Sequence, residues 1–403
     1  AYEMCGRYWS SDVFSSDLPS AKWLPRSGPD ELNRVTEMGT SSYIYAIGKR
    51  TLAAIVCALT LLGCDSVIYD GEGDCSVNYR VKFRYDMNLK FADAFAHEVE
   101  SVTLYLLDGG GRVVWQRTES GEALGKEGYA MEVDVAPGTY DLLAWCGSTD
   151  KGSFRIPESS SGKELTCTLK RESGSDGTGH VREDLDRLYH GYLPNQTFGD
   201  TEGTYTYVVP LVKNTNNVRV VLQQTSGEQL DEKRFSFRIT AENGRMDWDN
   251  QLLPDEPVTY HAWHKQSATA GTALPDLPDA VTSVNAVVAE LTTARLTVRD
   301  KSATFRSATG ANTPALLPEE LPEERKMRLT VRDNDTGKTV LSIPLVDYAL
   351  LVKGEYRRDM DDQEFLDRMD EYNIVCVLGE GMRWISMSIN IHSWKMVWQN
   401  TGI

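Results

Sequence analysis

Apolar and polar residues alternate with a period of two through most of the chain after residue 74. The stretch CSVNYRVKFRY at 75–85 places five apolar residues on one side of an extended chain, namely Val77, Tyr79, Val81, Phe83 and Tyr85. Similar runs follow at 99–108, 112–117, 128–135, 139–147, 163–170 and 204–212. Short turns rich in glycine or proline join several of them, as at 109–111 and 136–138. Short alternating strands joined in this way predict an antiparallel β-sandwich.

The second half of the chain repeats the pattern. Alternating runs occur at 216–225, 233–244, 257–264, 287–300, 326–346 and 373–403. One helix is predicted at 361–372, where Phe365, Leu366 and Met369 form an apolar stripe. The segment 173–194 lacks a clear period and is predicted to be a surface loop with at most one helical turn. We therefore expect an all-β chain with two tandem antiparallel sandwich domains, at 64–214 and 215–403, and one short helix in the second.

A short apolar run interrupts the polar N-terminal region. TLAAIVCALTLLGC at 51–64 follows Lys49 and Arg50 and ends at Gly63 and Cys64. Twelve apolar residues are too few to span a bilayer, and they fit the hydrophobic region of a signal peptide. Leu61-Leu62-Gly63-Cys64 resembles the lipobox of bacterial lipoproteins, in which the cysteine becomes the first residue and carries acyl chains. We expect cleavage between Gly63 and Cys64 and lipidation of Cys64; the alternative is a buried helix with an incidental cysteine.

This interpretation divides the N-terminal region in two. Met38 would begin a signal peptide of ordinary length at 38–63. Residues 1–37 open with Ala1 and have no sustained period of 2 or 3.6. We expect them to be a disordered or non-native leader, because an independent domain of this length and pattern would lack a core.

The net charge limits the partners. The chain carries 42 basic and 59 acidic residues, a formal charge of -17. The six basic and six acidic residues before Cys64 cancel, so the mature chain keeps this charge. A strongly acidic protein is not expected to bind nucleic acid or an anionic membrane surface. No second apolar run approaches spanning length, so we expect membrane attachment through lipid alone.

Four cysteines would remain besides the lipidated one: Cys75, Cys146, Cys167 and Cys376. An even number in an exported chain is compatible with disulfides. Cys75 begins one predicted strand and Cys146 ends another, so the two would meet if these strands were antiparallel neighbours. A Cys75–Cys146 disulfide is the prediction, and buried free thiols are the alternative.

The sequence contains no recognisable catalytic or cofactor-binding set. His261 and His264 are three residues apart, but no third metal ligand stands at a suitable spacing. Asp361 and Asp362 are better placed to cap the predicted helix than to act as an acid–base pair. We expect no enzyme activity, no metal and no cofactor other than acyl chains on Cys64, and no small-molecule substrate.

The order of the motifs resembles one known family. Residues 64–108, GTYDLLAWCG at 138–147, LVKNTNNVRVVLQ at 211–223, FSFRITAENGRMDWDN at 235–250 and NIHSWKMVW at 390–398 are similar to the FimB-like anchor subunits of Bacteroidales type V fimbriae. The resemblance implies two transthyretin-like sandwich domains and a surface-exposed outer-membrane lipoprotein. Such a protein attaches a fimbrium to the cell and limits its length, with fimbrial stalk subunits as partners.

Subunits of this class are expected to join by β-strand addition, in which an extended segment of one subunit completes a sheet of another. The C-terminal segment 386–403 alternates, and Ile389, Ile391 and Trp394 mark it as a possible strand-exchange segment. The alternative is an ordinary strand of the second domain. For the whole protein, the alternative to an anchor is a surface or fimbrial-tip adhesin that binds a glycan or a protein.

Overall fold

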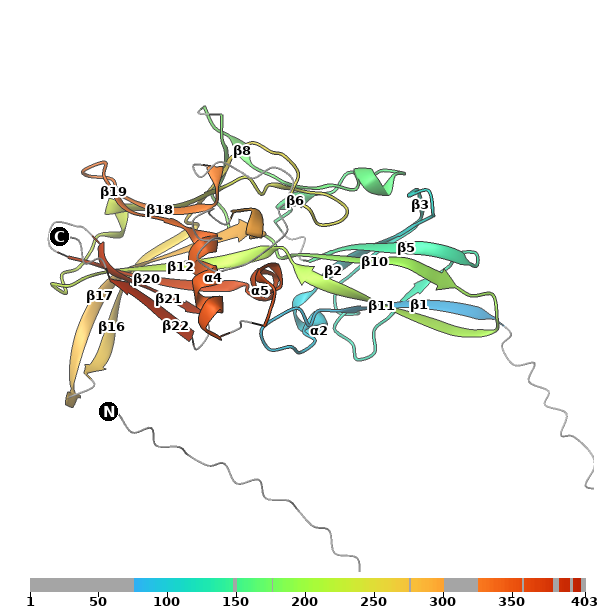
Figure 1. Ribbon diagram of the computed structural model, residues 1–403, viewed down its shortest axis with the longest axis horizontal. Coiled ribbons are helices and arrows are strands. Elements are labelled where there is room, and N and C mark those ends of the chain that lie inside the picture. The colour runs from blue at the N-terminus through green and yellow to red at the C-terminus, as the bar shows by residue number, and fades with distance from the viewer. Residues whose placement is uncertain are drawn as a thin grey trace, which may run out of the picture. The chain divides into compact units, whose positions relative to one another are not determined.

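The computed structural model describes residues 76–147, 151–175, 177–274, 277–300, 325–356, 359–379, 384–391 and 394–399 (Figure 1). These residues belong to one unit that extends from residue 74 to 403. Within it, strands predominate and form two sandwiches, so the all-β prediction is confirmed. No helix among the described residues is long and apolar enough to cross a membrane.

The first sandwich is built on a seven-stranded sheet with the order β3-β2-β5-β10-β11-β1-β4. Its strands in chain order are β1 (Val77–Arg84), β2 (Ser101–Leu107), β3 (Val113–Ser120), β4 (Met131–Val133), β5 (Gly138–Gly147), β10 (Leu188–Phe198) and β11 (Gly203–Lys213). A short helix, α2 (Phe95–Glu98), precedes β2. The sheet encloses a core that takes aromatic and aliphatic side chains from β1, β2, β5, β10 and β11.

The strands β2, β5 and β10 are also covered on their second face. A three-stranded sheet in the order β14-β7-β6 supplies the cover, with β6 (Phe154–Arg155), β7 (Cys167–Leu169) and β14 (Arg245–Met246). A separate apolar cluster joins it to Leu143 and Trp145 of β5. We call this side of β2, β5 and β10 the covered face. Its burial explains why the end of β5 is apolar without alternation.

The second sandwich packs two six-stranded sheets around the largest core. One has the order β16-β17-β12-β20-β21-β22, with β12 (Thr215–Gln224), β16 (His264–Leu274), β17 (Leu277–Ala294), β20 (Glu371–Leu378), β21 (Trp384–Ile391) and β22 (Trp394–Gln399). The other has the order β19-β18-β13-β15-β9-β8, with β8 (Glu172–Ser173), β9 (Gly179–Val181), β13 (Phe235–Ala241), β15 (Val258–His261), β18 (Arg328–Asp333) and β19 (Thr339–Pro344).

The two sandwiches exchange strands. Residues 167–169 and 179–181 fall within the predicted first domain, but β7 pairs with β14 and β9 pairs with β15 of the second half. In Figure 1 the green β8 accordingly belongs to the same sheet as the orange strands β18 and β19, at the opposite end of the strand order. The predicted boundary at 214/215 does fall at Asn214, the residue between β11 and β12. A single cut there would nevertheless separate β7 from β14, and the β8–β9 pair from β15.

The sequence led us to expect purely antiparallel strand pairing, and this expectation was wrong for three pairs. β1 runs parallel to β11, β12 runs parallel to β20, and β9 runs parallel to β15. All other strand pairs in the described part of the chain are antiparallel.

Two predictions of local structure were wrong. The segment predicted as a loop at 173–194 contains β8, β9 and the start of β10, whose first four residues are buried. Because β10 is covered on both faces, its sequence cannot alternate. The second error was a missed helix, α4 (Leu345–Tyr356), whose apolar side chains are buried at spacings of one, three and four. The predicted helix is confirmed as α5 (Asp362–Arg368), and the Asp361 side chain caps it by accepting a hydrogen bond from the Gln363 N–H.

Candidate functional site

Strand β1 has neighbours on both sides, β11 and β4. Its parallel register with β11 runs over eight pairs, from Val77 opposite Gly203 to Arg84 opposite Pro210. On its other side β4 pairs with three residues, Tyr79 to Val81. The N-terminal strand is therefore an internal strand of the sheet, and its removal would leave β11 and β4 with unpaired edges.

The inward face of β1 is aromatic and fully buried. The exposed fractions of Tyr79, Val81, Phe83 and Tyr85 are 5%, 0%, 4% and 1%. The Tyr79 hydroxyl donates to the Gly199 carbonyl at 2.6 Å. Burial raises the pKa of Tyr79 and of Tyr85, so both phenols stay neutral hydrogen-bond donors.

Neighbouring aromatic rings extend this face. Tyr85 meets Tyr189 edge-on at 5.0 Å between centroids, and Phe83 stacks with Phe95 at 5.7 Å. The buried side chains of Tyr79, Val81, Phe83 and Tyr85 therefore fix the position of β1 more strongly than main-chain hydrogen bonds alone would.

A groove follows the free edge of this sandwich. It is lined by Val77–Arg80 of β1, by residues 115–117 of β3 and by residues 132–134 of β4, and has a volume of about 350 Å³. β3 and β4 are the two ends of the strand order, so the groove separates two sheet edges. One long hydrogen bond spans it, from the Arg117 guanidinium to the Glu132 carbonyl at 3.4 Å.

The C-terminal segment forms two strands rather than one continuous donor strand. Ile389 and Ile391 lie in β21, Trp394 lies in β22, and Ile391 pairs with Trp394 across the hairpin. β21 also pairs with β20, so it is an internal strand of the second sandwich. Within the described residues β22 pairs with β21 alone and ends the sheet. The main-chain groups along its other edge are the ones that an added strand would use.

The predicted lipidation site cannot be located in the structure, because Gly63 and Cys64 lie outside the described residues. The predicted Cys75–Cys146 disulfide was argued from antiparallel neighbouring strands, and β1 and β5 are not such neighbours. β1 and β5 run in the same direction with β10 and β11 between them, and the register places Cys146 level with the end of β1. Cys75 itself lies outside the described residues, so the disulfide stays a prediction. Cys146 is buried and forms no disulfide with a described residue.

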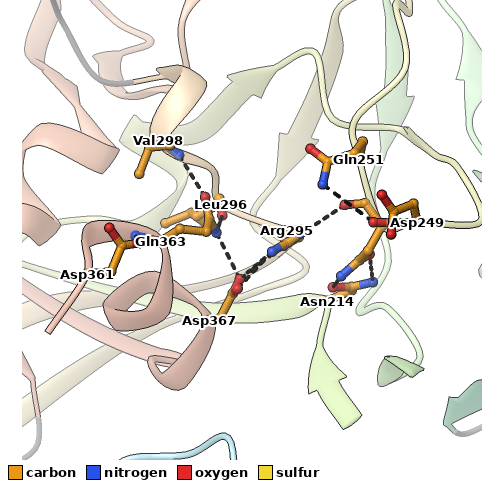
Figure 2. Close-up of polar contacts among 10 residues, drawn as sticks. Asn214, Asp249, Gln251, Arg295, Leu296, Val298, Asp361, Gln363 and Asp367 are labelled. Atoms are coloured by element: carbon orange, nitrogen blue, oxygen red, sulfur yellow. Dashed lines mark hydrogen bonds and ion pairs between the residues drawn. The ribbon is translucent and has the colours of Figure 1, made fainter. Parts of the chain in front are cut away.

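A buried polar network joins the two sandwiches (Figure 2). Arg295, just after β17, makes a bidentate ion pair with Asp367 of α5, and both side chains are 11% exposed. The same guanidinium donates to the Asn250 carbonyl, and Asn250 exchanges amide hydrogen bonds with Asn214 between β11 and β12. Gln363 completes the group with a 2.9 Å hydrogen bond to Asp367. The network therefore binds α5, the covering loop at 247–252 and the junction residue together.

A second set of contacts crosses the junction beside it. The Lys213 ammonium, 6% exposed, contacts Glu98 of α2 at 3.2 Å and Asp370 at 2.7 Å. The Arg368 guanidinium donates to the Asp86 carbonyl at 2.9 Å. Contacts of this kind are buried and charged, so they favour one fixed geometry of the two sandwiches.

Two of the histidines stand side by side in the structure, although they are distant in sequence. Nδ1 of His180 on β9 is 3.0 Å from Nε2 of His261 on β15. Burial, followed by the charges of Arg182 and Arg238, lowers the pKa of His261 to about 4. No group of three metal-ligating side chains occurs among the described residues. The sequence could not show the pair, because β9 and β15 become neighbours only through strand exchange.

A polar pocket of about 230 Å³ lies where β12, β17 and β20 meet the residues before β10. Asp184, Arg219, Glu290 and Glu371 line it, together with Trp263, which is 39% exposed. Trp263 gives the pocket one exposed aromatic ring beside polar side chains, although most small-molecule sites are lined mainly by apolar side chains. Sequence patterning missed this pocket, because it is assembled from five separate segments.

Comparison with known proteins identifies the family. The family described as fimbrillin-A-associated anchor proteins Mfa1 and Mfa2 matches residues 72–400. No curated protein sequence matches the chain. A Bacteroides thetaiotaomicron protein provisionally assigned as an adhesin is 33% identical, with a TM-score of 0.65 over 81% of this chain and 99% of that one.

Two further structures are similar. One, from the same species and provisionally assigned to polysaccharide binding, is 27% identical, with a TM-score of 0.62 over 81% of this chain and 99% of that one. The fimbrial anchor protein Mfa2 of Porphyromonas gingivalis has the same fold at 14% identity, with a TM-score of 0.52 over 78% of this chain and 98% of that one. Because the family match spans almost all of the chain after residue 71, the chain belongs to the family of fimbrillin-A-associated anchor proteins.

Proposed function

We propose that the chain is an anchor subunit, held in the outer membrane by acyl chains on Cys64, which ends the fimbrium at its base. Its family is one of fimbrial structural proteins at the cell surface and not of enzymes. The observation that carries the proposal is the position of β1 between β11 and β4, with its inward face buried. While β1 remains there, no strand of another subunit can enter the same position, and the fibre cannot extend in that direction.

Acyl chains on Cys64 would hold the protein firmly and close to the membrane. Each buried methylene contributes about 0.8 kcal/mol, so two or three acyl chains hold a protein firmly whereas one does not. Twelve residues separate Cys64 from Val77. A segment of this length spans at most about 40 Å, so the first sandwich would stay close to the bilayer.

The fibre would join this subunit by β-strand addition. The outer edge of β22 is the proposed contact for a stalk subunit, because β22 ends its sheet within the described residues and belongs to the segment with Ile389, Ile391 and Trp394. The proposal requires no enzyme activity, no metal, no cofactor beyond the acyl chains, no nucleic acid and no small-molecule substrate.

Intact mass of the membrane-extracted protein tests the lipid. The wild-type chain should begin at Cys64 and carry acyl chains. Cys64→Ala should abolish acylation and release fimbriae from the cell. Cys57→Ala, a control within the same apolar run, should leave both unchanged. An unacylated wild-type protein that begins elsewhere would refute the lipid anchor.

Controlled opening of the sheet tests the termination mechanism. A protease site placed in the turn at 88–92 would detach β1 after cleavage, whereas the same site in the exposed turn at 109–112 would cut without detaching β1. A fluorescent peptide with the sequence of residues 76–85 should bind only the first cleaved variant, after mild denaturant has released β1. Equal binding to intact protein would show that β1 does not close the position.

A second candidate is a surface or fimbrial-tip adhesin. The pocket around Trp263 favours it, because an exposed indole with polar neighbours suits a sugar ring. A glycan array decides between the two. Hits that disappear in Trp263→Ala, with fimbriae still attached in Cys64→Ala cells, would support the adhesin.

A further inference from the structure

The second sandwich has a sheet face that points away from its core. On the sheet β19-β18-β13-β15-β9-β8, alternate residues are buried in the core and their neighbours face outward. We call this side the outer face. The strand register fixes its main members, which are Arg238, Arg328, Thr330, Arg332, His180, His261 and Glu172, with Arg182 directly after β9.

The outer face is basic although the chain is acidic. It carries four arginines, and Glu172 is the only outward carboxylate within the described bounds of these six strands. The whole chain has a formal charge of -17. Acidic residues outnumber basic ones in the chain, so a face with four arginines and one carboxylate departs from the average composition.

Few of these cations are neutralised. Arg182 pairs with Glu172 at 3.2 Å, with both side chains more than half exposed. Arg332 donates to the Gly337 carbonyl at 2.9 Å, which leaves its charge unpaired. Arg238 is exposed and has no ion-pair partner among the described side chains. The lowered pKa of His261 is consistent with this positive charge, because Arg182 and Arg238 are the next largest causes of the shift after burial.

The spacing of the cations is regular. Arg238 pairs with Thr330, so Arg328 and Arg332 lie diagonally to either side of it on β18. His261 lies directly opposite Arg238 on β15. Diagonal neighbours on antiparallel strands are about 7–8 Å apart, and adjacent strands about 4.8 Å. The face thus offers donors in two dimensions at intervals of a few ångströms.

The chemistry of the face selects the kind of partner. Protein interfaces are centred on aromatic or aliphatic side chains. Apart from Pro344, the outward positions of these strands hold arginine, histidine, threonine, serine and one glutamate. A divalent metal at the histidine pair would be repelled by Arg182 and Arg238. Repeated anionic groups on a flexible hydrophilic chain match the face better.

We propose that the outer face binds an acidic polysaccharide, with Arg238, Arg328 and Arg332 contacting its carboxylate or sulfate groups. The guanidinium forks bind such oxyanions in a bidentate manner, and the threonine and serine hydroxyls bind neutral sugar oxygens between them. The proposal does not depend on whether the chain is an anchor or an adhesin.

The test measures binding of the full chain to immobilised heparin, hyaluronate and neutral dextran at 0.15 M salt. Wild-type protein should bind the first two and not dextran, and binding should weaken as salt rises. The double variant R238E/R332E should lose at least tenfold in affinity. The control R112E/R117E makes the same change in net charge on the first sandwich, at two exposed and ion-paired arginines, and should change affinity less than twofold.

Three outcomes would overturn the proposal. One is the absence of wild-type binding to both acidic polymers. The second is an equal loss in the two double variants, which would indicate overall charge rather than a site. The third is concentration-dependent self-association that R238E/R332E abolishes, which would make the face an interface between copies of the chain. Unchanged unfolding midpoints would exclude misfolding of either variant.

Discussion

Strands β5 and β13 occupy comparable positions within their sandwiches but differ in what covers them. β5 is buried on both faces over its last six residues, whereas β13 alternates strictly between buried and outward residues. The difference arises because β6, β7 and β14 lie over the first sheet, and nothing described lies over Arg238 and Thr240. β5 and its neighbours β2 and β10 are therefore closed to partners on both faces, whereas β13 presents one face to them.

The largest expected effect comes from a charge on the covered face. Leu143 is 0% exposed and belongs to the apolar cluster between β5 and the sheet β14-β7-β6. Leu143→Asp should destabilise the protein by about 4 kcal/mol or more, because it buries an unpaired carboxylate. Thr240→Asp on β13 should change stability by less than about 0.5 kcal/mol. Denaturant unfolding of both variants measures the contrast, and similar midpoints would show that the covered face is solvated.

The next effect concerns the ion pair that holds the covering loop. Asp367→Asn should cost about 3 kcal/mol, because it leaves the Arg295 guanidinium buried without its countercharge. Arg295→Met combined with Asp367→Leu should recover most of this loss, since an apolar pair needs no countercharge. If the double variant is as unstable as the single one, the network acts through Asn250 and not through charge pairing.

A third test uses pH. His190 lies on the covered face, donates to the Trp248 carbonyl at 2.9 Å, and burial lowers its pKa to about 4. The unfolded chain has the ordinary value of about 6.5, so it binds a proton more readily than the fold between these values. The stabilisation is complete above pH 6.5 and is lost as the pH falls toward 4, by about 3 kcal/mol in total. His190→Gln should show a flatter dependence over this range, and an unchanged slope would contradict the assignment to His190.

The smallest effect is expected on the outer face. Arg238→Ser removes an exposed side chain without an ion pair in the described structure, so stability should stay within about 0.5 kcal/mol of wild type. Calorimetry provides the measurement. A larger loss would mean that another part of the chain packs on the outer face, and the contrast with β5 would disappear.

The same contrast explains which parts of the fold could be predicted. β1 and β13 each have one solvent-exposed and one buried face, so their alternation was recognised from the sequence. The start of β10 and the end of β5 are buried on both faces. β5 was nevertheless predicted because turns bound it, whereas β10 follows a glycine-rich stretch and was predicted to be a loop. Helix α4 was missed because its residues continue the apolar run of β19 without a polar break.

The candidate sites were predicted less completely. The aromatic face of β1 followed from period-two spacing, and the C-terminal segment was recognised as strand-forming. The His180–His261 pair could not be seen in the sequence, because it depends on β9 joining β15 across the domain boundary. The basic outer face could not be seen either, because it depends on the register of β13 with β18, two strands far apart in the sequence. The net charge of -17 also concealed the outer face, since a sum over the chain contains no information on distribution.

The parallel register of β1 and β11 would have a mechanical consequence for the proposed anchor, which would be held through Cys64. A pull from the membrane would act on the start of β1, and a pull from the fibre would reach the end of β11 through Asn214 and β12. The two strands would then slide along each other, so that the hydrogen bonds across eight residue pairs share the force and break together. A hairpin pulled from its open end loses its bonds one at a time. If the chain is the proposed anchor, the parallel neighbour of β1 thus gives it the stronger loading geometry.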